Sequence, residues 1–82
     1  MNDQEKLRVL LPHWIEHNEG HGKEFTKWAN LLHGAGESDL ADLLNRASAS
    51  LKEADTVLRA ALERSGGALQ DHDHHHHHNL PE

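Results

Sequence analysis

Apolar residues recur along residues 7–32 at alternating steps of four and three positions, the spacing of one face of an α-helix. A second series with the same steps runs through residues 40–65. No segment alternates apolar and polar residues with period two, so the pattern predicts no strand. The facing positions are Leu7, Leu11, Trp14, Asn18, His21, Phe25, Trp28 and Leu32 in the first helix, and Leu40, Leu44, Ala47, Leu51, Ala54, Leu58, Ala61 and Ser65 in the second.

A short connection separates the two predicted helices. The run Gly34-Ala35-Gly36 is typical of a helix end followed by a turn. Ser38 is the expected N-cap of the second helix, with Asp39 placed to favour the positive end of its dipole. A loop this short makes the helices antiparallel, and a turn centred near Gly36 makes Trp28 face Leu44. The pattern predicts a core of large side chains comprising Leu11, Trp14, Phe25, Trp28, Leu44, Leu51 and Leu58.

Helix-breaking residues interrupt the first pattern. Pro12 lacks an N–H and clashes with the carbonyl of Arg8, which predicts either a kink or a separate short helix before Pro12. Gly20 and Gly22 each cost about 1 kcal/mol relative to alanine within a helix. The predicted fold is an all-α antiparallel helical hairpin. Because two helices bury only one face each, dimerisation into a four-helix bundle is a further alternative.

Composition divides the chain and excludes several functions. The 82 residues contain no cysteine, which rules out disulfides, thiolate metal sites and a cysteine nucleophile. A formal charge of −6 argues against nucleic acid and anionic membrane surfaces as partners, and no apolar run is long enough to span a membrane. We expect a cytoplasmic protein with a helical domain over residues 1–66 and a disordered, histidine-rich tail over residues 67–82.

Three histidines of the body recur at every fourth residue. His13, His17 and His21 therefore share one stripe of the predicted helix, and two histidines spaced in this way can bind one divalent metal ion. Asp55 faces His17 in the expected register and is a candidate additional ligand. The alternative is that His21 and Asn18 form a polar layer within the helical pairing, without metal.

The tail is the second candidate metal site. Five consecutive histidines follow Asp71-His72-Asp73, and such a segment binds nickel, zinc, copper or cobalt. A purification tag is the alternative, but tags usually carry six or more histidines, and this chain continues to Glu82. The candidate ligands in the tail are His72, His74, His75, His76, His77 and His78.

Enzymatic function is not predicted. The segment His13-Trp14-Ile15-Glu16-His17 matches the H-x-x-E-H pattern of inverted zinc proteases. The chain is far smaller than such catalytic domains, and a five-residue match is weak in a sequence rich in histidine and glutamate.

Two resemblances add to this interpretation. The segment Leu11-Pro12-His13-Trp14-Ile15-Glu16-His17-Asn18, followed by His21, Phe25, Trp28 and Ala29, resembles a family of small helical domains of unknown function, over about residues 5–62. The tail is similar in composition to the histidine-rich segments of nickel metallochaperones used in hydrogenase and urease maturation.

The predicted function is binding of nickel, cobalt or zinc, as a metal chaperone, buffer or sensor. A client metalloenzyme or maturation factor is the implied partner. The alternative is a metal-free helical interaction module with a polar histidine and asparagine layer.

Overall fold

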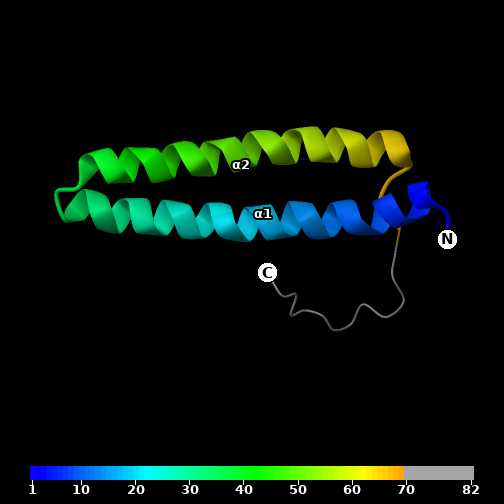
Figure 1. The fold of residues 1–82 in the computed structure, drawn as a ribbon, viewed down its shortest axis with the longest axis horizontal. Helices are drawn as coiled ribbons and strands as arrows, with labels where there is room; N and C mark the ends of the chain where they lie inside the picture. Colours follow the sequence, from blue (N-terminus) through cyan, green and yellow to red (C-terminus); the bar gives the residue numbers. More distant parts are fainter. Residues whose placement is uncertain (70–82) are drawn as a thin grey trace.

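The computed structural model describes residues 1–69 as two long helices joined by a tight turn. Helix α1 spans Asp3–Gly34 and helix α2 spans Ser38–Ser65. The helices lie side by side and antiparallel along their whole length (Figure 1). The predicted all-α helical hairpin is confirmed, and residues 1–69 contain no strand. Within these residues neither helix has a stretch long and apolar enough to cross a membrane.

Both helices end in glycine-dependent caps, as the sequence predicts. Gly36 and Gly66 adopt positive φ angles of 85° and 118°, which side chains other than glycine disfavour. After α1 the backbone N–H groups of Ala35, Gly36 and Glu37 donate to carbonyls of its last turn, and after α2 those of Gly66 and Gly67 do the same. The predicted N-cap of α2 is wrong by one residue. Glu37 occupies that position without a side-chain hydrogen bond, and Ser38 is already helical.

Helix α1 continues through Pro12 without a break, so the alternative of a separate short helix before this proline is wrong. Pro12 has no N–H to donate to the carbonyl of Arg8, four residues earlier. The backbone N–H of Leu69 donates to that carbonyl instead, at 3.3 Å. The sequence predicts a tail from residue 67, yet Leu69 still contacts α1. A residue after α2 therefore donates to the carbonyl whose helical bond proline removes.

The residues buried between the helices are mostly small. The buried apolar side chains are Leu11, Ile15, Ala29 and Ala41, and Gly22, Ser48 and Asp55 are buried beside them. The prediction that Trp14 and Trp28 are core residues is wrong for the hairpin, since they are 44% and 51% exposed. The other predicted core residues apart from Leu11 are half-buried, namely Phe25, Leu44, Leu51 and Leu58.

The difference has a simple geometric origin. The contact line of each helix runs through buried and half-buried residues: Arg8, Leu11, Ile15, Asn18, Gly22, Phe25, Ala29 and Leu32 of α1, and Ala41, Leu44, Ser48, Leu51, Asp55, Leu58 and Leu62 of α2. On α1, Ile15, Gly22 and Ala29 are each one residue after a position that the periodicity placed against the other helix. Small residues at the contact line let the two backbones approach closely, whereas two tryptophans there would hold them apart. Each helix is consequently rotated relative to the prediction, and Trp14 and Trp28 lie along one side of the contact line.

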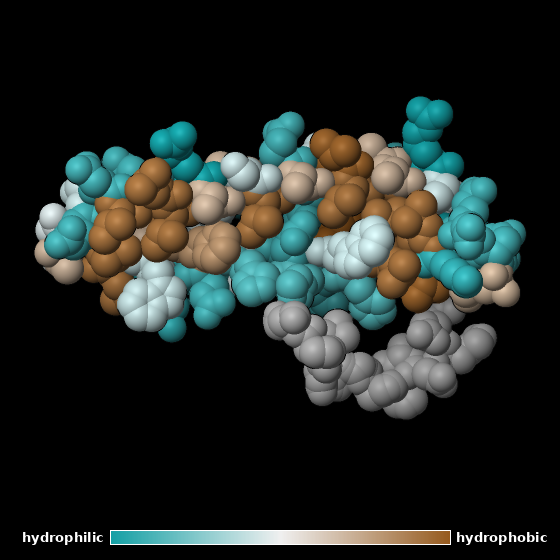
Figure 2. Space-filling view, in the orientation of Figure 1, coloured by the Kyte–Doolittle hydropathy of each residue, from teal (hydrophilic) through white to brown (hydrophobic). Residues whose placement is uncertain are grey.

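This rotation gives the hairpin two chemically different faces. Consecutive residues of a helix point about 100° apart, so residues just before and just after a contact-line position lie on opposite sides. The residues just before it make up what we call the apolar face: Leu7, Leu10, Trp14, His17, His21, Glu24, Trp28 and Leu31 of α1, with Leu40, Leu43, Ala47, Ser50, Ala54, Val57 and Ala61 of α2. Figure 2 shows apolar side chains gathered over both helices along this side.

Candidate functional site

A hydrogen-bonded pair of polar side chains lies between the helices near the middle of the hairpin. The Nδ2 group of Asn18 donates to Oδ1 of Asp55 at 2.9 Å. Asp55 is only 6% exposed, although it carries a carboxylate. A buried polar group is costly unless it is hydrogen-bonded, and the amide of Asn18 supplies that bond. The pair links α1 to α2 at one defined register.

A second polar contact lies two turns away along the hairpin. The Ser48 hydroxyl donates to the carbonyl of Gly22 at 3.2 Å, and its oxygen is also 3.2 Å from the Thr26 hydroxyl. Gly22 is buried, and a Cβ added there would lie 3.6 Å from the Ser48 oxygen. The absent side chain leaves room for α2 to approach the backbone of α1.

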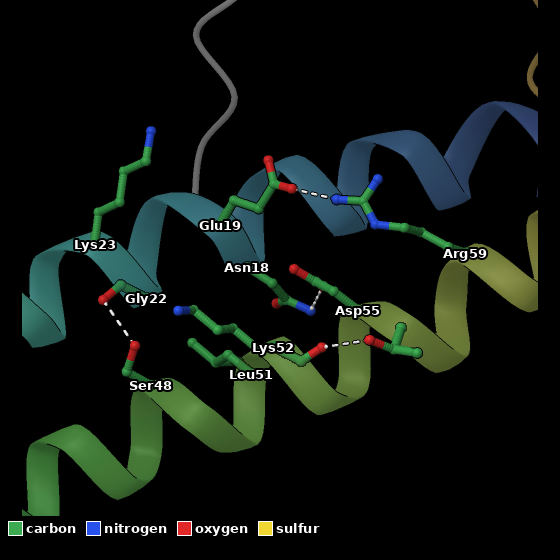
Figure 3. A pocket seen from close by; sticks show the side chains of 10 residues that line it. Asn18, Glu19, Gly22, Lys23, Ser48, Leu51, Lys52, Asp55 and Arg59 are labelled. Atoms are coloured by element: carbon green, nitrogen blue, oxygen red, sulfur yellow. Dashed lines mark hydrogen bonds and ion pairs between the residues drawn. The ribbon is translucent and has the colours of Figure 1, made fainter.

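These contacts form the floor of an open groove of about 480 Å³ on the polar side of the hairpin. The N-terminal part of α1 lies at the right in both Figure 1 and Figure 3, but α1 is below α2 in Figure 1 and above it in Figure 3. Figure 3 is therefore seen from the back, and the groove faces away from the viewer of Figures 1 and 2. Arg59 and Glu19 form an ion pair across its rim. The groove is lined by Asn18, Glu19, Gly22, Lys23, Ser48, Leu51, Lys52, Asp55, Thr56 and Arg59. Its lining suits hydrogen bonding and carries charges of both signs.

Two of the predicted metal ligands lie together on the apolar face. The rings of His17 and His21 meet edge to face with centroids 4.6 Å apart. The His21 ring also lies near Phe25, at 6.0 Å between centroids, and its Nδ1 is 3.9 Å from Oε1 of Glu24. Histidine pairs four residues apart on a helix suit a divalent metal, because both imidazoles project from adjacent turns of one face.

The other predicted ligands are placed differently. His13 is exposed on α1, and Asp55 is buried against Asn18, one residue away from the predicted neighbour His17. Within residues 1–69, no three histidine or carboxylate side chains form a group suited to hold a metal ion. A single hairpin thus brings together the pair His17 and His21. The six tail ligands, His72, His74, His75, His76, His77 and His78, lie outside the described residues.

The hydrogen bond between Asn18 and Asp55 was not predicted from the sequence. Asn18 was visible as a polar residue on the predicted contact line. Asp55 has the same signal, since it stands among Leu51, Leu58 and Leu62 at steps of four, three and four. A carboxylate at such a position predicts a buried polar partner on the facing helix.

At the end of the hairpin away from the turn, side chains of α1 hydrogen-bond to backbone carbonyls at the end of α2 and just after it. Arg8 donates from Nε to the Gly67 carbonyl at 2.6 Å and from a terminal guanidinium nitrogen to the Gly66 carbonyl at 3.0 Å. Gln4 donates to the carbonyl of Ser65 at 2.9 Å. These cationic and amide donors satisfy carbonyls that the end of α2 leaves without helical partners.

Comparison with known proteins places both helices in one family. Residues 7–65 match a family described as a domain of unknown function, DUF8180. The chain belongs to this family. An uncharacterized protein of Archaeoglobus fulgidus is 31% identical over 62 residues, which cover 76% of this chain and 98% of the relative. No solved structure gives a significant match.

The resemblance to a small helical family of unknown function is therefore confirmed. The matched region includes His17, His21 and the Asn18–Asp55 pair, and it ends before the histidine-rich tail.

Proposed function

We propose that this protein binds a divalent transition metal ion, namely nickel, cobalt or zinc, through histidine side chains. The observation that carries the proposal is the pairing of His17 and His21 on adjacent turns of α1, with ring centroids 4.6 Å apart. Neutral imidazole is a good ligand for all three metals. The exposure of this side of α1 gives an ion access from solvent.

The tail provides a second and chemically different set of ligands. Six histidines within seven residues offer several overlapping sites, so the tail is proposed to capture metal with modest affinity at each site. The helical body, with its better-defined pair, would then hold an ion more selectively. The compositional similarity of the tail to nickel metallochaperones supports a role as a cytoplasmic chaperone, buffer or sensor that serves a client metalloenzyme or maturation factor. The proposal gives no catalytic role to the segment His13-Trp14-Ile15-Glu16-His17.

Calorimetric titration of the full chain tests the proposal. Nickel and zinc are expected to bind at neutral pH, with an affinity order of copper above nickel above cobalt. A variant with the six tail histidines replaced by serine should lose most of the bound equivalents and keep a tighter remainder. The double substitution His17→Gln and His21→Gln in that background should remove the remainder. A full chain that binds neither metal in chelator-free buffer contradicts the proposal.

A metal-free interaction module is the second candidate. Trp14, Trp28, Leu43 and Val57 are 44%, 51%, 54% and 60% exposed, and such apolar surface is typical of a contact with another helical surface. The Asn18–Asp55 pair would act as the polar layer that defines the register of the hairpin. Stable association with a helical partner in the presence of a chelator, combined with absent metal binding, favours this candidate over the first.

A further inference from the structure

The apolar face extends over both helices and is larger than a lone hairpin covers. A helix that contacts one partner needs a narrow apolar seam, whereas a helix in a four-helix bundle carries additional apolar positions beside the seam. Both helices carry large apolar residues beside the contact line that the hairpin leaves exposed, namely Leu10, Trp14, Trp28 and Leu31 of α1 and Leu40, Leu43 and Val57 of α2. Helix α2 is about 42 Å long and two helices are about 20 Å wide, so the face covers roughly 800 Å², which is the area each partner of a stable complex buries.

We propose that a second copy of this chain covers the apolar face, with the two hairpins antiparallel and related by a two-fold axis at the level of Glu19. The interface this creates also brings the His17 and His21 pairs of both chains together as one metal site. This inference rests on the proposed function for its metal, and on the apolar face for its dimer.

The arrangement of residues on α1 carries the choice of a second copy. In a two-fold interface, each residue meets a residue equally distant from the axis on the other chain. Around Glu19, this relation pairs Leu7 with Leu31, Leu10 with Trp28 and Trp14 with Glu24 of the other copy. Apolar side chains therefore meet apolar side chains toward both ends of the interface, and the polar positions of the face gather near its centre. Glu19 also lies at the middle of α1, which makes the overlap of the two helices complete.

Helix α2 fits the same axis. The contacts of Gly22 with Ser48 and of Asn18 with Asp55 place the level of Glu19 near residues 51–54 of α2. The apolar-face residues there are Ser50 and Ala54, which are small and permit close approach of two α2 helices. The large residues Leu40 and Leu43 lie toward the ends, where they cover the neighbouring hairpin.

The histidines lie next to the proposed axis. His17 and His21 are two residues on either side of Glu19, so His17 of each chain meets His21 of the other. One hairpin supplies two imidazoles, and residues 1–69 of a single chain contain no group of three ligands. Two copies supply four, which matches the preferred coordination number of zinc and suits the other imidazole-binding metals.

The composition of residues 71–82 differs from what this surface would match. Leu80 is the one residue of the hydrophobic types among them, whereas the face carries several tryptophans and leucines.

The oligomeric state gives the first test. Light scattering after size exclusion, at about 50 micromolar chain, is expected to give the mass of two chains for the full-length protein. Leu43→Glu adds a charge to the apolar face at a 54% exposed position and should give one chain. Asn45→Glu adds the same charge to α2 on the polar side and should remain a dimer. Circular dichroism should show equal helix content in all three. A wild-type protein of one-chain mass, or a Leu43→Glu protein of unchanged mass, overturns the proposal.

Cross-linking tests the orientation. The natural chain has no cysteine, so a single one introduced by Ala54→Cys reports contact between equivalent positions. Ala54→Cys near the axis should form a disulfide dimer on mild oxidation, and Leu40→Cys, far from the axis, should not. Efficient cross-linking of Leu40→Cys with none of Ala54→Cys overturns the antiparallel arrangement.

Metal stoichiometry tests the shared site. In the full-length variant with serine at the six tail histidine positions, zinc is expected to bind at one ion per two chains. Leu43→Glu should weaken this binding at least about tenfold, because the monomer keeps only two imidazoles. One ion per chain that is unaffected by Leu43→Glu, or a dimer that binds no zinc, overturns the shared site. In either case the tail of the unmodified chain still tests the proposed function separately.

Discussion

The amide of Asn18 and the carboxylate of Asp55 meet between the two helices at 2.9 Å, at a point where the carboxylate is almost fully buried. The bond joins residues 37 positions apart in the sequence. It holds the two helices at one register, because sliding either helix by a turn would leave the buried carboxylate without its donor.

Removing this carboxylate should destabilise the hairpin. Asp55→Ala is expected to lower the free energy of unfolding by about 1–3 kcal/mol, since Asn18 is left with an unpaired donor in a partly buried place. Asp55→Asn, whose side-chain carbonyl can still accept the bond, should cost less. Urea denaturation followed by circular dichroism measures both. Asp42→Ala, at an exposed position of the same helix, is the matched control and should change stability little.

Burial at the contact line should govern the stability of the hairpin. Leu11 is 2% exposed, so Leu11→Ala is expected to cost about 2–5 kcal/mol. Leu31 is 52% exposed, so Leu31→Ala should cost about half as much or less. Thermal and urea unfolding at low protein concentration make the comparison. Equal losses from the two substitutions would contradict the contact line described above.

Two glycines should respond in opposite directions to alanine. Gly20 is helical, and an added Cβ meets nothing within 4 Å, so Gly20→Ala should stabilise the protein by about 1 kcal/mol. Gly66 has a φ of 118°, and a Cβ there would lie 3.1 Å from the Arg8 guanidinium carbon. Gly66→Ala is therefore expected to destabilise the end of α2. Melting temperatures of the two variants test the sign of each effect, and a shared sign would refute it.

The link between Pro12 and Leu69 should be visible by hydrogen exchange. The amide of Leu69 is expected to be protected, because it donates to the Arg8 carbonyl. Pro12→Ala supplies a helical N–H to the same carbonyl and should stabilise α1 while it speeds exchange at Leu69.

Arg8→Lys keeps the charge of this side chain but loses the planar fork that reaches the carbonyls of Gly66 and Gly67. This substitution should speed exchange in the last turn of α2. If neither variant changes the exchange rates at Leu69 and in that turn, the hydrogen bonds of Leu69 and Arg8 do not hold this end of the hairpin together.

Metal binding should depend on pH in the direction set by imidazole chemistry. Protonated histidine cannot ligate a metal, so affinity for nickel and zinc is expected to fall as pH is lowered from neutrality toward about 6. Titrations of the full chain at several pH values, with a buffer correction for released protons, measure this trend. Binding that stays unchanged over this range would point to carboxylate ligands, which protonate only at about pH 4, in place of His17, His21 and the tail.

Much of the hairpin follows from local sequence signals. The steps of three and four, the glycines after each helix and the short connection predict the two helices, their ends and their antiparallel pairing. The continuity of α1 through Pro12 does not follow in this way. Where Pro12 removes the helical donor, the carbonyl of Arg8 accepts from Leu69, which is 57 residues away from the proline.

The candidate site was predicted in part, for a related reason. The spacing of His17 and His21 on one helix is a local property, and the structure keeps them together. Whether His17 lies beside Asp55 depends on how the two helices are rotated about their axes. The rotation differs from the prediction by one residue position, so Asp55 bonds to Asn18 and not to His17. Periodicity reports which residues share a broad stripe, but it does not report which edge of that stripe faces the neighbouring helix.

Helicity, helix length and topology of this chain are encoded in spacing and cap residues, because these act within a few residues along the backbone. The contact line and the two faces depend on packing. Gly22, Ala29, Ala41 and Ser48 lie where the helices are closest, since small side chains allow the backbones to approach and bury polar and apolar groups together. Trp14 and Trp28 fit the same stripe by periodicity, but their volume places them beside the contact line, on the face that we propose a second hairpin covers.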